Sequence, residues 1–551
     1  MVWLHGVCPR SARLRDGINR FGAYFWRRRY GLVLLAFAPV HAQTGAGLSL
    51  LEAVRATLSN NPSLRAQQAQ IEIAIGLKDQ ASGIFDPLLQ GGLTHAFSMF
   101  APTLTTPQGE LLPSPTITED SNLTTFSFSS SKLFRDGISV TPSVQMQRTD
   151  DSFIAPEGIN NGTAGVTVTI PLLQGRGRSV VAAQETAARQ EIEASRLDLD
   201  FLLSQLASNA ANDYWSLVAA VRNLGVAASA EERGKVYVET TQALIDADHV
   251  PRNDINEVKA NLAQRTAARI AAQQTVWQAR QQLALDMGLA PAEILTDMAD
   301  PSDDFPAIPA ELAPRDDAAA MKSYLDQALK QRADYLAAQN RRGQSEILEV
   351  AARNRLLPVL NLQMGAGYSA IRPGTAFGDY LIGPFSNVRG PNITGGLTYT
   401  FPVGNHAARG VLEQDVAAVR QGDVRITQTA QGISQQIVVA VKGVRNAILR
   451  VRESRSEVDS SQQSVDGARE KYRAGLGSVV EILQVEDQLN TALGDQVQAQ
   501  LAYAQALVQL RFATATLVPA HQATPTITPD VLFTLPFGNM DLQTGGKDSN
   551  R

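Results

Sequence analysis

The sequence has almost no cysteine and few histidines. Cys8 is the only cysteine in 551 residues, and the six histidines are scattered along the chain. This excludes a disulfide framework and a cysteine-based zinc site, and it argues against a local histidine metal motif. The formal net charge of −5 argues against nucleic acid as a partner. A nucleophile elbow, a P-loop, an HExxH motif and a glycine-rich dinucleotide fingerprint are all missing, so the sequence predicts neither an enzyme nor a cofactor.

Long hydrophobic runs are also missing after residue 42. Before that point, the basic segment Trp26–Tyr30 precedes the apolar run Gly31–Val40, and Val40 and Ala42 supply small residues for cleavage before Gln43. We therefore predict a signal peptide over residues 1–42. An N-terminal membrane anchor is the alternative, although ten apolar residues are too few to span a bilayer comfortably. Cleavage would remove seven Arg and one Asp together with Cys8, and would leave a cysteine-free chain of net charge −11.

The remaining sequence repeats one plan twice. Each half opens with an amphipathic helix, over about 51–84 and 324–356, which stops at Pro87 or Pro358. Alternating segments, a very long helical pattern and a final stretch of 30 to 40 residues follow. We predict a first repeat at 43–289 with strands over about 88–170, an acidic, proline-rich linker at 290–322, a second repeat at 323–518 with strands over about 359–401, and an extended or disordered tail at 519–551. The long helices are expected over about 176–289 and 405–517.

The alternating segments have one apolar and one polar face. In the second half, Leu360, Leu362, Met364, Ala366 and Tyr368 alternate with Asn361, Gln363, Gly365 and Gly367. Such a period of two predicts strands. A soluble sandwich would give the same pattern. The polar face is small and uncharged and the apolar face carries aromatics, which favours a membrane β-barrel with a wet lumen.

The long helices carry coiled-coil repeats. Ile437, Val444, Val451, Val458, Val465 and Tyr472 recur every seven residues, and Leu203, Ala210, Leu217 and Leu224 do so in the first half. A helix of about 60 residues spans roughly 90 Å and needs other helices along its length. Four to six strands are too few for a water-filled barrel. We therefore expect several copies in cyclic symmetry to share one barrel and one helical tube.

Three segments together resemble the TolC-like outer-membrane efflux proteins: the opening at 48–96, Ile170–Gly177 after the strands, and Ala468–Leu489. The resemblance covers about residues 48–518. It implies an α+β fold in which a homotrimer forms an outer-membrane β-barrel, embedded in lipid, that continues as a coiled-coil helical barrel into the periplasm. It also implies a passive efflux or type I secretion channel that meets a periplasmic adaptor and an inner-membrane pump of the RND, ABC or MFS type.

The same resemblance implies roles for residues at the helix tips. Tyr472, Asp254 and Asn253 match a gate latch, and Glu481 matches the first of two acidic constriction positions, with Gln484 at the second. Gly477 stands where relatives carry a basic latch residue. Simpler interpretations are a heptad rung for Tyr472, a helix N-cap for Asp254 and a solvated surface glutamate for Glu481. The expected adaptor contacts are His249, Val250, Pro251, Arg252, Gly475, Leu476, Gly477 and Ser478.

One feature departs from the family pattern. Relatives usually contribute four strands per protomer, whereas this chain has six strand-like segments. The additional pair over 123–148 turns at Arg135–Gly137 and either enlarges the barrel or decorates one end. Two other classes of protein remain: a periplasmic coiled-coil adaptor or scaffold with a soluble β domain, and a secreted enzyme.

Overall fold

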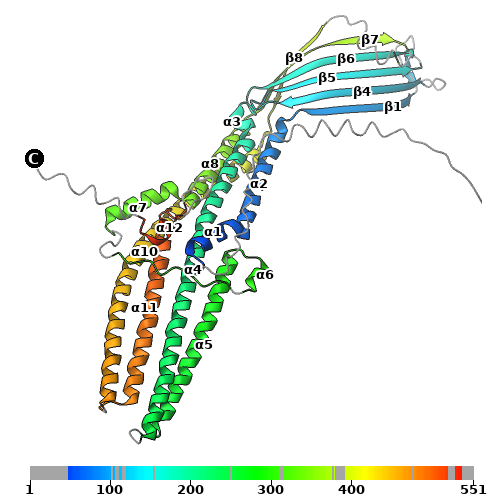
Figure 1. The fold of residues 1–551 in the computed structure, drawn as a ribbon. Coiled ribbons are helices and arrows are strands. Elements are labelled where there is room, and N and C mark those ends of the chain that lie inside the picture. Colours follow the sequence, from blue (N-terminus) through cyan, green and yellow to red (C-terminus); the bar gives the residue numbers. More distant parts are fainter. Residues whose placement is uncertain are drawn as a thin grey trace, which may run out of the picture. The chain divides into compact units, whose positions relative to one another are not determined.

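The fold is described by a computed structural model (Figure 1). It covers residues 47–100, 103–105, 111–113, 119–152, 155–247, 251–296, 298–309, 316–374, 378, 391–474, 476–518 and 528–536. All of these lie in one structural unit, Ala46–Arg551. The predicted signal peptide lies outside the described residues. Within the described part, no helix is both long and apolar enough to cross a membrane.

Each opening helix is interrupted, although one continuous helix was predicted in each half. The first consists of α1 (Leu50–Asn60) and α2 (Pro62–Ser82), followed by a 3-10 turn, η1 (Gly83–Phe85). Asn61 takes a non-helical conformation because the ring of Pro62 disfavours the α region for the residue before it. The Asn61 side chain then caps α2 by accepting a hydrogen bond from the Ser63 N–H.

The second interruption has a different cause. α7 (Ala318–Gln331) and α8 (Ala333–Asn354) are separated by Arg332, whose backbone is extended. The buried Arg332 guanidinium lies 2.7 Å from an Asp334 oxygen, and its central carbon is 5.6 Å and 5.2 Å from the ring centroids of Phe201 and Phe512. Tertiary contacts therefore accompany this break, where no proline is present.

The predicted strands form one antiparallel sheet drawn from both halves of the chain. Its order is β1-β4-β5-β6-β7-β8. The strands are β1 (Leu88–Phe100), β4 (Glu119–Leu133), β5 (Ser139–Asp151), β6 (Ala155–Pro171), β7 (Val359–Pro373) and β8 (Pro391–Thr400). A separate short pair comprises β2 (Thr103–Thr105) and β3 (Leu111–Pro113). The sheet is not closed within the described part of one chain, because β1 and β8 are each paired on one side only.

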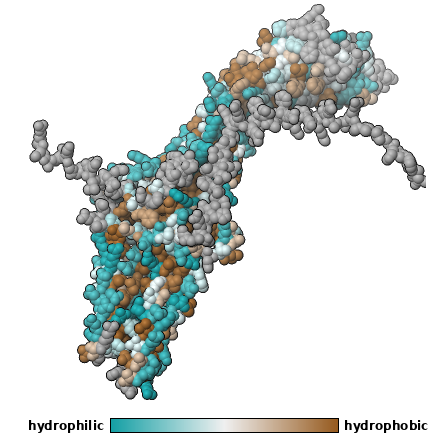
Figure 2. All heavy atoms as spheres, in the orientation of Figure 1, coloured by the Kyte–Doolittle hydropathy of each residue, from teal (hydrophilic) through white to brown (hydrophobic). Residues whose placement is uncertain are grey.

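The strand pairing confirms the predicted alternation of faces. One row across all six strands contains only polar residues and glycine: Gln90, Ser129, Ser143, Gly165, Gly367 and Asn392. The adjacent row, on the other face, contains Gly91, Phe128, Val144, Ala164, Tyr368 and Pro391. The large apolar side chains remain exposed, for example Leu93 at 71% and Ile393 at 81%. In Figure 2, hydrophobic residues gather over part of the sheet. The sheet therefore has one uncovered apolar face and one polar face.

The long helices pair as two antiparallel hairpins. α3 (Arg178–Val181) precedes α4 (Ala183–Asp246), which packs along α5 (Asp254–Asp286), and α10 (His406–Arg473) packs along α11 (Val479–Ala513) (Figure 1). At 64 and 68 residues, α4 and α10 are each about 100 Å long. Most of the predicted heptad positions are buried, including Val444, Val451 and Val465, whereas Val458 is half-buried. This confirms coiled-coil packing within the chain.

The main core joins these helices to the linker and the tail. Trp215 on α4 is fully buried, stacks on Phe305 at 5.8 Å and meets the edge of Phe533 at 5.7 Å between ring centroids. Phe533 belongs to α12 (Pro529–Phe533), a short helix within the segment predicted to be extended or disordered. The three consecutive apolar residues at 531–533 explain the difference, since Leu532 is buried in the same core. In the linker, α6 (Pro291–Ile294) is the short helix before the segment that contacts α1.

Candidate functional site at the helix tips

Each helix hairpin ends in a short turn that carries predicted contact residues. Pro251, Arg252 and Asn253 are exposed before α5, and Leu476 is 82% exposed before α11. Ser478 caps α11 by accepting a hydrogen bond from the Glu481 N–H at 3.2 Å. His249, Val250 and Gly475 lie outside the described residues. The described tips therefore present accessible side chains at the ends of the helix hairpins.

The predicted latch residues lie close together but form no hydrogen bond with one another. Tyr472 is near the end of α10, and α5 begins at Asp254 with Asn253 as a cap residue that makes no side-chain cap hydrogen bond. The Tyr472 hydroxyl is buried without a hydrogen-bond partner of good geometry among the described residues. Burial raises the pKa of Tyr472; nearby Thr241 lowers it in part, and the charge of Asp254 raises it further. The two latch groups are thus near enough to interact electrostatically.

The predicted constriction residues lie on the first turns of α11. Glu481 is half-buried and Gln484 is exposed. Lys471 on α10 donates a hydrogen bond to Glu481 Oε1 at 3.3 Å, so this carboxylate has a cationic neighbour in its own hairpin. Gly477 lies beside both, because a Cβ there would be 3.3 Å from the Lys471 Cβ and 3.5 Å from Glu481 Oε2. A larger side chain at 477 would crowd this pair.

A small apolar cluster holds the two hairpins together near the tips. Val258 of α5 and Val479 and Leu483 of α11 are almost fully buried. Tyr237, Val238 and Tyr472 pack around them from α4 and α10. All four long helices contribute to this cluster, so an outward movement of either hairpin would expose apolar surface.

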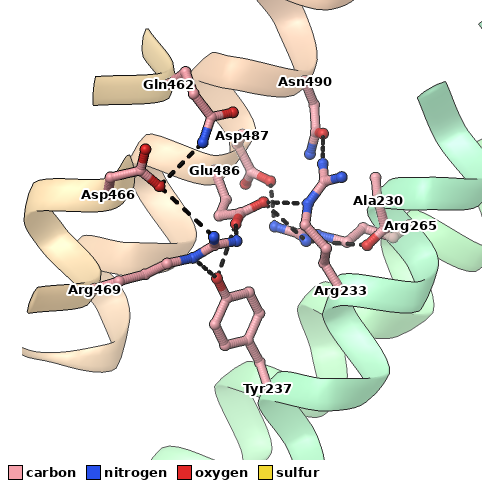
Figure 3. A network of polar contacts seen from close by, with 10 residues as sticks. All are labelled: Ala230, Arg233, Tyr237, Arg265, Gln462, Asp466, Arg469, Glu486, Asp487 and Asn490. Atoms are coloured by element: carbon pink, nitrogen blue, oxygen red, sulfur yellow. Dashed lines mark hydrogen bonds and ion pairs between the residues drawn. The ribbon is translucent and has the colours of Figure 1, made fainter. Parts of the chain in front are cut away.

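A polar network beside this cluster was not predicted from the sequence. At its centre is Glu486 of α11, which is completely buried (Figure 3). Arg233 Nε of α4 donates to Glu486 Oε2 at 2.7 Å, and Tyr237 Oη of α4 donates to Oε1 at 2.8 Å. Arg469 Nη2 of α10 also donates to Oε1, at 2.6 Å. One carboxylate therefore binds groups from two other helices, on both hairpins.

Further contacts extend the network to α5. Arg265, 5% exposed at its side chain, donates to the Ala230 carbonyl and to Asp487 Oδ1, each at 3.1 Å. Arg265 Nη1 also lies 3.9 Å from Glu486 Oε2. Arg233 reaches Asn490 of α11 in addition to Glu486. The network thus joins α4, α5, α10 and α11, and it clamps the helix pair α4/α5 to the pair α10/α11.

Arg233 and Arg469 keep the buried Glu486 carboxyl ionised. Burial alone would raise the pKa of Glu486, but the hydrogen bonds from Arg233 and Tyr237 and the charges of Arg233 and Arg469 hold it below its usual value. Burial raises the pKa of Tyr237, which therefore remains a neutral donor. Glu486 is accordingly an anion at neutral pH, compensated by cations on both hairpins. We refer to Arg233, Tyr237, Arg265, Arg469, Glu486 and Asp487 as the Glu486 clamp.

Only a weak signal for this clamp is present in the sequence. Glu486 lies at a core position of α11 between the apolar residues Leu483 and Leu489, where a carboxylate is costly unless it is paired. That conflict could have suggested a buried ion pair, which was not predicted, but it could not identify partners 249 and 253 residues away. No group of three or more His, Cys, Asp or Glu residues in the described part of the chain could hold a metal ion.

Comparison with known proteins identifies the family of the second half. Residues 324–516 match the family model described as outer membrane efflux protein. This segment, about a third of the chain, is therefore similar to outer membrane efflux proteins. The match supports, over this segment, the resemblance to outer-membrane efflux proteins predicted from the sequence. No curated protein matches the chain.

Solved structures share the fold over most of the chain. The outer-membrane channel OprN matches with a TM-score of 0.61 and 19% identity, covering 85% of this chain and 90% of its own. The Campylobacter jejuni CmeC outer membrane channel matches with a TM-score of 0.60 and 15% identity, covering 88% and 92%. VceC from Vibrio cholerae matches with a TM-score of 0.59 and 17% identity, covering 84% and 95%. The matched segment is thus part of a fold that extends over both halves.

Proposed function

We propose that three copies of this chain form a passive duct in the outer membrane that carries solutes from the periplasm to the exterior. The apolar face of the sheet would contact lipid and the polar face would line the pore. The helix hairpins would form a tube in the periplasm, and their tips would gate it. A periplasmic adaptor and an inner-membrane pump of the RND, ABC or MFS type would deliver the cargo in an efflux or type I secretion system.

The open, two-faced sheet is the observation that carries this proposal. A six-stranded sheet cannot enclose a water-filled pore by itself, and its apolar face is left exposed. β1 runs away from α2 and β8 runs toward α10, so β8 of one copy can pair antiparallel with β1 of the next. Cyclic repetition would therefore pair both edges and close a barrel.

A periplasmic adaptor or scaffold with a soluble β domain is the competing function. It requires protein to cover the apolar face of the sheet. Leu89, Leu93, Phe97, Ile393 and Leu397 are all more than half exposed, which favours the duct.

Membrane fractionation and gel electrophoresis test the duct against the scaffold. We expect the protein in the outer-membrane fraction, extracted only with detergent, and migrating as a trimer that dissociates into monomers on heating. A detergent-free soluble monomer would overturn the proposal, and a soluble oligomer would favour the scaffold.

We also propose that Tyr472, Asp254 and Asn253 hold the tips closed and that Glu481, with Gln484 on the next turn, lines the constriction. The three Glu481 carboxylates would meet near the axis, each moderated by its own Lys471. The described tip residues Pro251, Arg252, Leu476, Gly477 and Ser478, together with His249, Val250 and Gly475, would bind the adaptor.

Removing the latch should open the tips. For Tyr472→Phe combined with Asp254→Ala, we expect a several-fold higher single-channel conductance in planar bilayers, because the polar interaction across the helix ends is lost. Trp277→Phe, on the exposed side of α5, is the matched control and should behave as wild type. Equal conductance of the double variant and wild type would exclude a latch role for these two residues.

A further inference from the structure

The additional strand pair is a hairpin of β4 and β5 that lies within the sheet. β1 pairs with β4 along its whole length, and β5 pairs with β6. Without the hairpin, β1 and β6 would be neighbours and would still be antiparallel. The hairpin therefore has the position of a wall segment inserted between two strands, and it does not extend beyond a sheet edge.

The hairpin shares both faces of the sheet. Phe126 of β4 is opposite Leu93 of β1 and Met146 of β5 on the apolar face. Ser127 is opposite Gly92 and Gln145 on the polar face. A decoration packed on one side of the sheet would have a covered face, whereas this hairpin continues both surfaces without interruption.

The turn of the hairpin is fixed to the helices. Arg135 donates to Glu185 of α4 at 2.7 and 3.1 Å, and the Glu185 side chain is only 3% exposed. The Arg135 guanidinium also lies over the ring of Phe85, 4.7 Å from its centroid. Because a buried carboxylate needs a partner, Arg135 is a structural part of the junction between sheet and helices.

Gly137 makes this close approach possible. Its φ of +95° is a conformation that other residues rarely adopt, and a Cβ there would lie 2.2 Å from the Gly175 carbonyl oxygen. The Gly177 N–H donates to the Asp136 carbonyl at 3.0 Å. The turn of the hairpin thus packs directly against the bend where β6 leads into α3.

We infer that this hairpin widens the pore: three copies of six strands give a barrel of eighteen strands instead of the twelve that four strands per copy would give. The inference rests on the proposed trimeric duct. Barrel diameter grows roughly linearly with strand number, so the exit is about half again as wide, and barrels of about this size hold an aqueous channel. The cargo class is therefore large hydrated solutes, including ones too wide for a twelve-stranded exit.

The inner surface carries no charge over most of the length of β5. We consider the rows of paired residues that cross β5 between Ser139 and Gln147. On the polar face, these rows contain Ser, Thr, Gly, Asn and Gln, with Leu and Ile at the ends, and none of these residues is ionisable. This part of the inner surface therefore provides no selection by charge, which Glu481 at the helix tips would provide.

Deletion of the hairpin provides the direct test. A variant lacking residues 119–152 keeps an even number of strands, and β1 can pair with β6. Electron cryomicroscopy of both proteins in lipid nanodiscs should give trimers whose barrels differ in diameter, with wild type about 1.5-fold wider. Trimers of equal diameter would overturn the wider pore and leave the duct intact. Failure of the wild type to form a trimer would instead overturn the proposed function.

A second measurement covers the case in which the deletion variant does not fold. Ser129 and Phe128 are neighbours on β4 and lie on opposite faces of the sheet. The variants Ser129→Cys and Phe128→Cys are each made in the full-length chain that also carries Cys8→Ser. A charged, water-soluble maleimide added to the trimer in liposomes should label Ser129→Cys at least tenfold faster than Phe128→Cys. Equal labelling would mean that both faces of β4 meet water, and it would overturn a wall position for the hairpin.

Discussion

Replacing Glu486 by Gln should weaken the closed helix tips more than any other single change near the gate. The variant keeps the shape of the side chain but leaves Arg233, Arg469 and Arg265 beside a neutral amide. Breaking a buried ion pair in this way costs about 3–5 kcal/mol. We expect a lower thermal unfolding midpoint and a higher leak conductance, because both effects follow from release of the α4/α5 hairpin from the α10/α11 hairpin.

The pH dependence separates this electrostatic effect from a packing defect. The pKa of folded Glu486 is lowered, so the stabilisation it provides is complete above its unfolded pKa and is lost as the pH falls through the folded pKa. The difference in stability between wild type and Glu486→Gln should therefore be full at neutral pH and should shrink well below pH ~4. A difference that is constant across this range would point to packing alone.

Two further variants serve as references for the effect of Glu486→Gln on stability and conductance. Glu453→Gln removes the same charge from an exposed position on α10 and should change neither stability nor conductance. Tyr237→Phe removes the hydrogen bond to Glu486 and the one accepted from Arg469 Nε but keeps the ring, so it should cost about 1–3 kcal/mol. If Glu486→Gln behaved like Glu453→Gln, the clamp would have no role in holding the hairpins together.

Truncating Trp215 to Ala should produce the second large effect, far from the tips. Trp215 is fully buried and contacts Tyr214, Phe305 and Phe533. Loss of a buried tryptophan costs about 3–5 kcal/mol because it leaves a cavity. Since Phe305 belongs to the linker and Phe533 to α12, we expect both segments to detach and to become sensitive to chymotrypsin, which cleaves after such aromatic residues.

The same chain provides the control for this prediction. Trp277 on α5 is 48% exposed, so Trp277→Ala should leave the unfolding midpoint and the proteolysis pattern nearly unchanged. Trp215→Phe should give an unfolding midpoint between those of Trp215→Ala and Trp277→Ala. Trp215 Nε1 makes no hydrogen bond with the described residues, so this variant loses none. Protection of the linker and α12 in Trp215→Ala would show that other contacts hold them.

The sheet could be predicted well because its signal is local. Alternating residues such as Leu362, Gln363 and Met364 assign the two faces without knowledge of the partner strand, and the pairing confirms them. The place of the β4–β5 hairpin was left open, because alternation is the same inside a sheet and at its edge. Only the register of Phe126 with both Leu93 and Met146 placed it inside.

The tips could be predicted only in part. Tyr472, Asp254 and Glu481 were selected by family resemblance, and the structure brings Asp254 close enough to Tyr472 to affect its pKa. The interruption at Asn61 could have been predicted from Pro62, whereas the one at Arg332 could not, since it coincides with contacts to Asp334, Phe201 and Phe512.

The sequence by itself determined the periodicities: a period of two for the strands, a seven-residue repeat for the rods, and two rounds of the same order. These follow from local geometry, which repeats every few residues. Tertiary structure alone decided which distant groups meet, such as Glu486 with Arg233 and Arg135 with Glu185. Such pairs depend on how whole helices and strands pack, and the sequence around a carboxylate does not identify the cation that will neutralise it.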